Sequence, residues 1–286
     1  MKKLLTPLAF FLLVSCMPSS SSDQAMQGSS EHQDHSEGSS VTAGTDRLSN
    51  SPRHQEWVEV KNGDKTIYTW VVYPEISEKR PVVILIHENK GLNAWELGSA
   101  DHVAEAGYIA VAPDLLSGFS DTMMRTSDFP AADDATKAIS QLKPESVMAD
   151  LKAVADWTKT IPAANGKLVS AGFCWGGGQS FRFASERKDL AAALVFYGTG
   201  PTEQSVYEKI SPPVFGFYGG ADARVNATLA QSEPVMTAAD KEAEYAPYDG
   251  AGHAFMRSGE DPAGDPANVA ARNAAWERMK QILSTL

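Results

Sequence analysis

Cys174 lies between two glycines, Gly172 and Gly176, at the end of an apolar run and just before a stretch with helical character. This spacing is typical of the sharp strand-to-helix turn that exposes a nucleophile. Small neighbours are needed there because the strand and helix backbones approach closely. A cysteine between glycines can also be a small apolar residue packed at such a turn. The pattern alone therefore leaves both interpretations open.

An acid and a base follow the cysteine in the order that nucleophilic hydrolases use. Asp222 comes after a predicted strand at 213–218, and His253 lies in a glycine-rich loop after a predicted strand at 243–247. The order of Cys174, Asp222 and His253 predicts a catalytic triad. His253 would take the thiol proton and later donate one to the leaving alcohol, while Asp222 would orient the imidazole. The alternatives are that Asp222 caps the next helix and that His253 is structural.

The predicted helix that begins after Cys174 has a chemical use. A free thiol has a pKa of about 8.5, so it needs a base or an electropositive site to react as a thiolate. The helix supplies the positive end of its dipole, and the backbone amide of Trp175 can stabilise an oxyanion. We expect a second amide donor from the loop that follows the predicted strand at 81–87.

The folded part of the chain must position these loops. Strand-like and helix-like segments alternate from Trp57 onward, which predicts an α/β fold with a doubly wound, mostly parallel sheet and helices on both faces. Ligands meet such sheets at the carboxyl ends of the strands. We interpret the longer segment 113–143 as a substrate-covering excursion. The predicted strands are 57–60, 67–73, 81–87, 108–112, 167–171, 192–197, 213–218 and 243–247, and the main helices are 95–105, 144–161, 176–187, 226–239 and 266–284.

Four motifs give a family resemblance. The segments Gly172 to Gly177, Gly220 to Asp222 and Gly252 to Arg257, with the loop His87 to Asn93, resemble the dienelactone hydrolase family, the carboxymethylenebutenolidases. The resemblance extends over roughly residues 56–286. It implies an α/β-hydrolase that opens a lactone or cleaves a small ester through a thioester intermediate, without metal or cofactor.

The resemblance also implies residue roles. It assigns to Glu88 an interaction with the resting thiol, and to the amide of Asn89 a place beside Trp175 in the oxyanion hole. Arg257 matches one of two arginines that bind a substrate carboxylate, but the segment 132–137 offers no counterpart of the second. We therefore expect a substrate other than dienelactone. Glu88 as a buried structural carboxylate and Arg257 as a surface residue remain alternatives.

The N-terminus predicts export. Two lysines precede an apolar run from Leu4 to Val14, which is too short to span a bilayer and fits a signal peptide over residues 1–15. The run ends before Cys16, in a pattern that resembles a bacterial lipobox, so we expect Cys16 to be acylated; an ordinary cleavable signal is the alternative. The serine-rich segment 16–54 is interpreted as a disordered tether and 55–286 as the enzyme domain. We therefore expect the protein to be located in the cell envelope, anchored to a membrane.

Charge and cysteine content narrow the function further. The 286-residue chain has a formal net charge of −11, which argues against nucleic acid as a partner. With Cys16 acylated, Cys174 is the single remaining thiol, and no intrachain disulfide can form. The sequence thus predicts a cysteine-dependent hydrolase of a small ester or lactone. The rival prediction is a catalytically silent surface lipoprotein that uses the same fold for binding.

Overall fold

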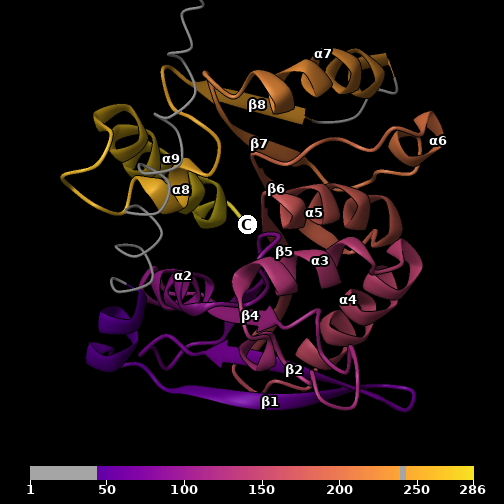
Figure 1. The fold of residues 1–286 in the computed structure, drawn as a ribbon, viewed down its shortest axis with the longest axis vertical. Helices are drawn as coiled ribbons and strands as arrows, with labels where there is room; N and C mark the ends of the chain where they lie inside the picture. The colour runs from indigo at the N-terminus through magenta and orange to yellow at the C-terminus, as the bar shows by residue number, and fades with distance from the viewer. Residues whose placement is uncertain (1–43, 239–242) are drawn as a thin grey trace, which may run out of the picture.

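The computed structural model describes residues 44–238 and 243–286, in which one eight-stranded sheet forms the centre of the molecule (Figure 1). The strand order is β1-β2-β4-β3-β5-β6-β7-β8. β1 and β2 form an antiparallel hairpin, β2 pairs antiparallel with β4, and all the other neighbours are parallel. The strands are β1 (Gln55–Asn62), β2 (Lys65–Val72), β3 (Arg80–Ile86), β4 (Ile109–Pro113), β5 (Ala164–Phe173), β6 (Leu190–Phe196), β7 (Val214–Gly219) and β8 (Ala243–Tyr248).

Helices cover both faces of this sheet (Figure 1). On one face α2, α8 and α9 pack on a core that includes Trp95, Phe173 and Phe255. On the other face α4, α5 and α7 pack on two further clusters, built around Leu151 and Phe181. The helices are α2 (Ala94–Glu105), η1 (Thr126–Asp128), α3 (Ala132–Ser140), α4 (Pro144–Thr158), α5 (Trp175–Glu186), α6 (Gln204–Tyr207), α7 (Ala223–Ala238), α8 (Phe255–Ser258) and α9 (Pro266–Ser284).

The central parallel strands are apolar on both faces because helices cover both. β3 is buried over Pro81–Ile86 and β4 over its whole length. Such strands lack the alternation of a half-exposed strand and read as continuous hydrophobic runs, as the sequence indicated. This architecture is the predicted α/β-hydrolase fold, and its parallel strands bring the loops after β3, β5, β7 and β8 to one edge of the sheet.

Part of the segment predicted to be a tether is packed on the domain. Residues 44–50 form a short helix, and the buried carboxylate of Asp101 on α2 binds three side chains from residues 47–53. Arg47 Nε lies 2.8 Å from Asp101 Oδ2, Arg53 Nε donates to Oδ1 at 2.7 Å, and the Ser51 hydroxyl donates to Oδ1 at 2.5 Å. The prediction of disorder was therefore wrong for residues 44–53, because long-range ion pairs compensate for the lack of apolar residues.

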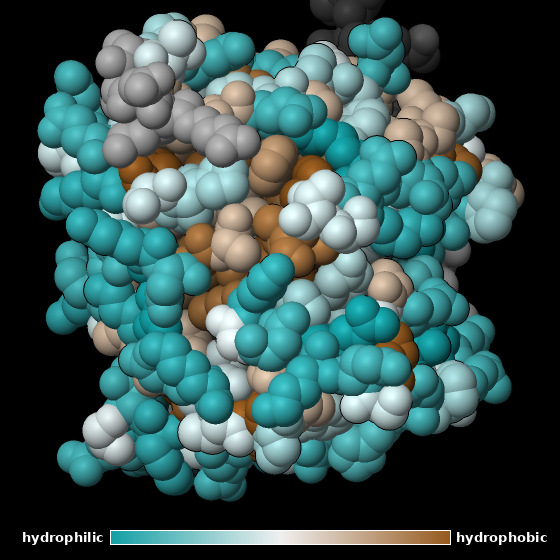
Figure 2. All heavy atoms as spheres, turned by 180° about the vertical axis from the view of Figure 1, so that it is seen from behind, coloured by the Kyte–Doolittle hydropathy of each residue, from teal (hydrophilic) through white to brown (hydrophobic). Residues whose placement is uncertain are grey.

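The other N-terminal predictions fall outside the described residues. The signal peptide at 1–15, Cys16 and the tether up to residue 43 lie there, and they stay predictions. Within residues 44–238 and 243–286, no helix is both long and apolar enough to cross a bilayer. The same residues contain no cluster of His, Cys, Asp and Glu side chains suited to a metal ion. Figure 2 shows one face of the molecule, on which hydrophobic side chains gather in a central hollow surrounded by hydrophilic ones.

Candidate active site

Cys174 occupies a strained turn between β5 and α5. Its backbone has φ 53° and ψ −115°, a conformation that a residue with a side chain rarely adopts. A Cβ at Gly172 would lie 2.0 Å from the Gly176 carbonyl oxygen, and one at Gly176 would lie 2.2 Å from the Ile86 carbonyl oxygen. Both glycines are therefore required by close backbone approach, as the sequence pattern predicted. The turn leaves the Cys174 side chain partly exposed at the carboxyl edge of the sheet.

The structure brings the three predicted triad residues together. His253 Nε2 lies 3.1 Å from Cys174 Sγ, and His253 Nδ1 lies 2.5 Å from Asp222 Oδ2. With the Nδ1 hydrogen donated to Asp222, Nε2 is left to accept the thiol hydrogen. The Asp222 side chain is 4% exposed and that of His253 is 32% exposed. The base is thus accessible from solvent, while the acid that orients it is buried.

Asp222 also caps the helix that follows it, which was the alternative to a catalytic role. Its Oδ1 accepts a hydrogen bond from the backbone amide of Val225 at 3.2 Å, in the first turn of α7. Its Oδ2 is the atom that faces His253. One carboxylate can serve both functions because its two oxygens point in different directions. The capping bond helps to fix the carboxylate in the orientation that the imidazole needs.

The environment of Cys174 favours the protonated thiol. Burial, followed by the negative charge of Glu88, raises the pKa of Cys174 to about 11. Hydrogen bonds from the backbone amides of Trp175 and Asn89 act in the opposite direction and lower the pKa of Cys174. The resting nucleophile is therefore a thiol beside a base, with the two predicted oxyanion donors already directed at the same region.

Glu88 is buried and held by two side chains. Its Oε1 accepts from the Tyr197 hydroxyl at 3.1 Å, and its Oε2 accepts from Arg257 Nε at 3.0 Å. The Glu88 side chain is 3% exposed. Its negative charge acts on Cys174 electrostatically. The predicted interaction of Glu88 with the resting thiol stays a prediction. Arg257 is bound to Glu88, and its role in binding a substrate carboxylate also stays a prediction.

Tyr197 is a site residue that the sequence reasoning missed. It follows the last residue of β6, has φ 39°, and is fully buried. Its ring meets the His253 ring edge to face at 5.2 Å between centroids, while its hydroxyl donates to Glu88. The loop after β6 lies at the same carboxyl edge as the triad loops, and that position was the available signal.

Glu96, on α2, supports the same loop from behind. Its Oε1 accepts from the Glu88 backbone amide at 3.1 Å, and its Oε2 accepts from the Asn93 amide at 3.3 Å. Burial, together with the charge of Glu88, raises the pKa of Glu96 to about 8. The first turn of α2 therefore fixes the backbone on which Glu88 and Asn89 are carried.

His87 is a buried structural residue. Leu115 N donates to His87 Nε2 at 3.2 Å, so the hydrogen is on Nδ1, which donates to the Glu88 carbonyl oxygen at 2.7 Å. Burial lowers the pKa of His87, which keeps the ring neutral. The ring stacks on Trp175 at 5.5 Å between centroids. His87 therefore ties the loop after β3 to the segment after β4 and to the nucleophile elbow, the turn of residues 172–176 between β5 and α5.

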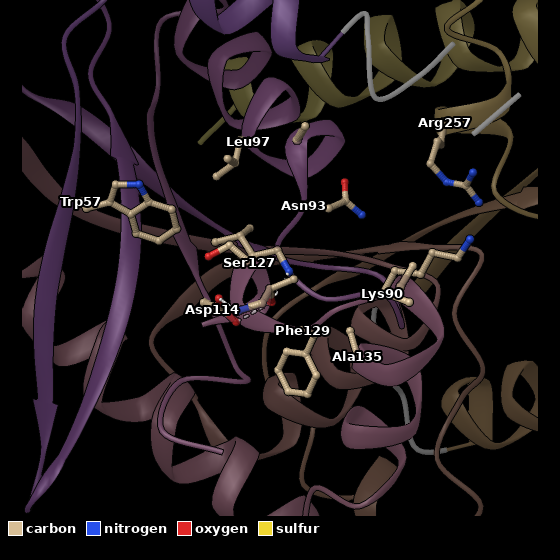
Figure 3. Close-up of a pocket in the computed structure, with 14 residues that line it drawn as sticks. Trp57, Lys90, Asn93, Leu97, Asp114, Ser127, Phe129, Ala135 and Arg257 are labelled. Carbon is tan, nitrogen blue, oxygen red and sulfur yellow. Dashed lines mark hydrogen bonds between the residues drawn. The ribbon is translucent and has the colours of Figure 1, made fainter. Parts of the chain in front are cut away.

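A cavity of about 400 Å³ adjoins the site (Figure 3). Cys174, Asp222 and His253 do not line it. It meets the site through Lys90, which follows Asn89 in the chain, and through Arg257, which binds Glu88. In Figure 3 these two cations lie at one end and Trp57 lies at the other. The segment 113–143, predicted to cover substrate, forms part of its wall.

Comparison with known proteins identifies the family of this chain. The model of the dienelactone hydrolase family matches residues 67–286. A protein of Saccharolobus solfataricus, provisionally named carboxymethylenebutenolidase, is 31% identical over 231 residues, which cover 70% of this chain and 88% of that protein. The carboxymethylenebutenolidase of Pseudomonas putida is 27% identical over 233 residues, covering 81% and 97%.

The fold is shared with solved structures. A Klebsiella pneumoniae protein, provisionally named dienelactone hydrolase, superposes with a TM-score of 0.72 at 23% identity, over 82% of this chain and 99% of that one. At this identity the likeness concerns the fold. The family match, however, runs from strand β2 to the C-terminal end of the chain and contains the elbow, the acid and the base. The chain belongs to the dienelactone hydrolase family and is a hydrolase of the α/β-hydrolase fold.

Proposed function

We propose that this protein hydrolyses a small carboxylic ester or lactone with Cys174 as the nucleophile. The observation that carries the proposal is the chain of contacts from Asp222 through His253 to Cys174, at 2.5 Å and 3.1 Å. A thiol with a pKa of about 11 is a poor nucleophile alone, so it needs a base at hydrogen-bonding distance. His253 Nε2 meets that requirement.

The reaction proceeds in two halves. As the Cys174 sulfur attacks the carbonyl carbon, its proton passes to His253 Nε2; the carbon–oxygen bond then breaks, and the leaving alkoxide takes that proton. This leaves a thioester on Cys174. Water then attacks the thioester carbonyl, giving its proton to His253, and the departing thiolate recovers it. The sum is ester plus water to acid plus alcohol, and a lactone gives a hydroxy acid.

Two backbone amides stabilise the negative charge that develops on the carbonyl oxygen. Hydrogen bonding from the backbone amides of Asn89 and Trp175 lowers the pKa of Cys174, which supports a position for both amides beside the carbonyl that the sulfur attacks. Trp175 also begins α5, so the partial positive charge of the helix N-terminus acts on the same oxygen. Removing one such preorganised donor from a comparable site costs about 3 kcal/mol of transition-state stabilisation.

The rival function, binding without catalysis, is less well supported. A binding protein has no need for a strained cysteine at φ 53°, nor for an imidazole oriented by a buried carboxylate. The backbone strain at Cys174 is maintained against a cost of roughly 1–3 kcal/mol, and exposure of a nucleophile explains why it is kept. We therefore favour catalysis.

The decisive experiment follows the acyl group. The purified protein is mixed with p-nitrophenyl acetate, quenched in acid within milliseconds to seconds, and analysed by peptide mass spectrometry. We expect an acetyl adduct on the peptide that contains Cys174, and p-nitrophenol release that Cys174→Ala abolishes. Equal rates for the two proteins would refute the proposal. An adduct on another residue would refute the assignment of the nucleophile.

We also propose that the protein is exported and anchored to a membrane by lipid on Cys16. The two N-terminal lysines, the apolar run from Leu4 to Val14 and the position of Cys16 support this address. Cys16→Ser is expected to abolish incorporation of radiolabelled palmitate in a bacterial host and to release the protein from the membrane fraction. Unchanged labelling would contradict the anchor.

A further inference from the structure

The cavity beside the active site has a predominantly apolar inner wall. Trp57 lies on β1, Leu97 lies on α2, Phe129 directly follows η1, and Ala132 and Ala135 lie on α3 (Figure 3). Four separate parts of the chain therefore line one cavity, which is open to solvent on one side. A volume of about 400 Å³ lies within the range of roughly 300–1,000 Å³ that is typical of small-molecule sites, which are mostly apolar.

The acidic group in this wall is already satisfied. The Asp114 carboxylate accepts hydrogen bonds from the Thr126 amide at 2.6 Å, from the Thr126 hydroxyl at 2.8 Å and from the Leu116 amide at 3.0 Å. These bonds hold the segment after β4 in place and use the carboxylate as a structural element. A charged ligand group in the inner cavity would lose its hydration without gaining a partner of opposite charge.

The topology of the sheet decides which part of an ester this cavity can receive. Cys174 follows β5, and the acid and base follow β7 and β8 on one side of it. The cavity lies on the other side, above β3, β4 and the β1–β2 hairpin, and it begins at Lys90, one residue after an oxyanion donor. Because His253 must protonate the leaving alcohol, that alcohol occupies the β7–β8 side. The acyl part then extends in the opposite direction.

We propose that this cavity is an acyl-binding pocket for an uncharged, apolar acyl group, such as a medium aliphatic chain or an aryl ring. The proposal rests on the proposed function, since it places the acyl group of the same ester. It assigns specificity to a wall of α3 alanines and to Leu97, with Trp57 at the far end. Substrates with a charged distal acyl group are excluded by the same wall.

The test compares two esters with the same leaving group. The ratio of kcat/KM for p-nitrophenyl hexanoate to that for p-nitrophenyl acetate reports on the acyl pocket alone. We expect the ratio to exceed one in the wild type and to fall by about tenfold in Ala132→Arg and Leu97→Trp, which introduce a cation or fill the space. Ser140→Arg, at the other end of α3 and outside the cavity lining, adds the same charge away from the cavity and should keep the wild-type ratio.

Two outcomes would contradict the acyl-binding pocket while leaving the proposed function intact. The first is an unchanged ratio in both variants, with Cys174-dependent hydrolysis intact. The second is that the two substitutions change the preference for the alcohol part instead, measured as the ratio of kcat/KM for hexyl acetate to that for ethyl acetate. In contrast, the proposed function is refuted if neither p-nitrophenyl ester is hydrolysed in a reaction that depends on Cys174.

A binding measurement makes the pocket testable without turnover. Cys174→Ala is titrated calorimetrically with N-(4-nitrophenyl)hexanamide, an uncleaved analogue of the longer ester. We expect binding that is weakened about tenfold when Ala132→Arg is added and that is retained with Ser140→Arg. Absence of binding, or equal binding by all three proteins, would overturn the pocket. Circular dichroism of each variant distinguishes a blocked cavity from a misfolded chain.

Discussion

Arg257 and Glu88 form an ion pair across the candidate site, with Arg257 Nε 3.0 Å from Glu88 Oε2. The two side chains are 15% and 3% exposed, so neither charge is well solvated. Removing one partner leaves the other buried without compensation, which is more costly than losing the pair itself. This pair therefore constrains both the stability of the fold and the state of the nucleophile.

Arg257→Ala is expected to lower the free energy of unfolding by about 3 kcal/mol, because it leaves the Glu88 carboxylate buried without its cation. Urea denaturation followed by circular dichroism measures the change. Adding Glu88→Gln should recover part of the loss, since the amide carries no charge that needs a partner. A double variant less stable than Arg257→Ala would contradict this account.

The reactivity of Cys174 should depend on pH in a defined direction. Burial and the Glu88 charge raise the pKa of Cys174 to about 11, so the thiolate fraction is small at neutral pH and grows as pH rises toward that value. Alkylation by iodoacetamide should therefore accelerate steadily above pH 8. Glu88→Gln should shift the profile to lower pH, because it removes a negative charge that opposes the thiolate.

Glu186→Gln is the matched control for that profile. Glu186 is the last residue of α5, and it pairs with Lys152 at the surface. It loses the same charge at the opposite end of the helix from Cys174, and it should leave the alkylation profile unchanged. A large thiolate absorbance near 240 nm at pH 7 in the wild type would contradict the raised pKa.

Glu96 should make stability depend on pH. Its folded-state pKa of about 8 is above the ordinary value of 4.5, because it is buried and faces Glu88. Between these two pH values the unfolded chain binds fewer protons than the folded protein, so the free energy of unfolding falls as pH rises. Glu96→Gln should reduce this slope, measured by urea denaturation at about pH 5 and pH 8. Equal slopes would contradict the raised pKa.

The contacts of Asp101 predict that residues 44–53 stabilise the folded domain. Burial alone would raise the pKa of Asp101, but hydrogen bonds from Arg53 and Ser51 hold it below its usual value. A chain that begins at residue 55 lacks these partners and should have a lower Tm than one that begins at residue 44. Asp101→Asn should reduce the difference between the two chains, because it removes the charge that needs compensation. Identical Tm values would show that residues 44–53 do not stabilise the domain.

The fold and the triad could be predicted because each depends on local pattern. The buried strands are short apolar runs, and the two glycines that the turn at Cys174 needs, Gly172 and Gly176, stand beside it in the sequence. The observed bounds of α4 and α9 begin at the predicted residues Pro144 and Pro266, since proline favours the first turn of a helix.

The remaining features depend on distant partners. Tyr197 has no motif around it, and its role arises only when β6 is placed next to β5 and β7. Glu96 reads as an ordinary capping residue until its carboxylate is seen on the Glu88 amide. Arg53 pairs with a residue 48 positions away, which composition cannot reveal. Serine-rich composition therefore indicated disorder in a stretch that is held by charge.

The attachment of residues 44–53 to α2 has a mechanical consequence. Tension applied to the chain before residue 44 enters the domain at Asp101, on the helix whose first turn carries Asn93 and Glu96, before it reaches the edge strand β1. The three side-chain contacts on this carboxylate, from Arg47, Ser51 and Arg53, must break before β1 bears the load. The N-terminal attachment thus protects the outer hairpin from peeling and directs force into the helix behind the Glu88 loop.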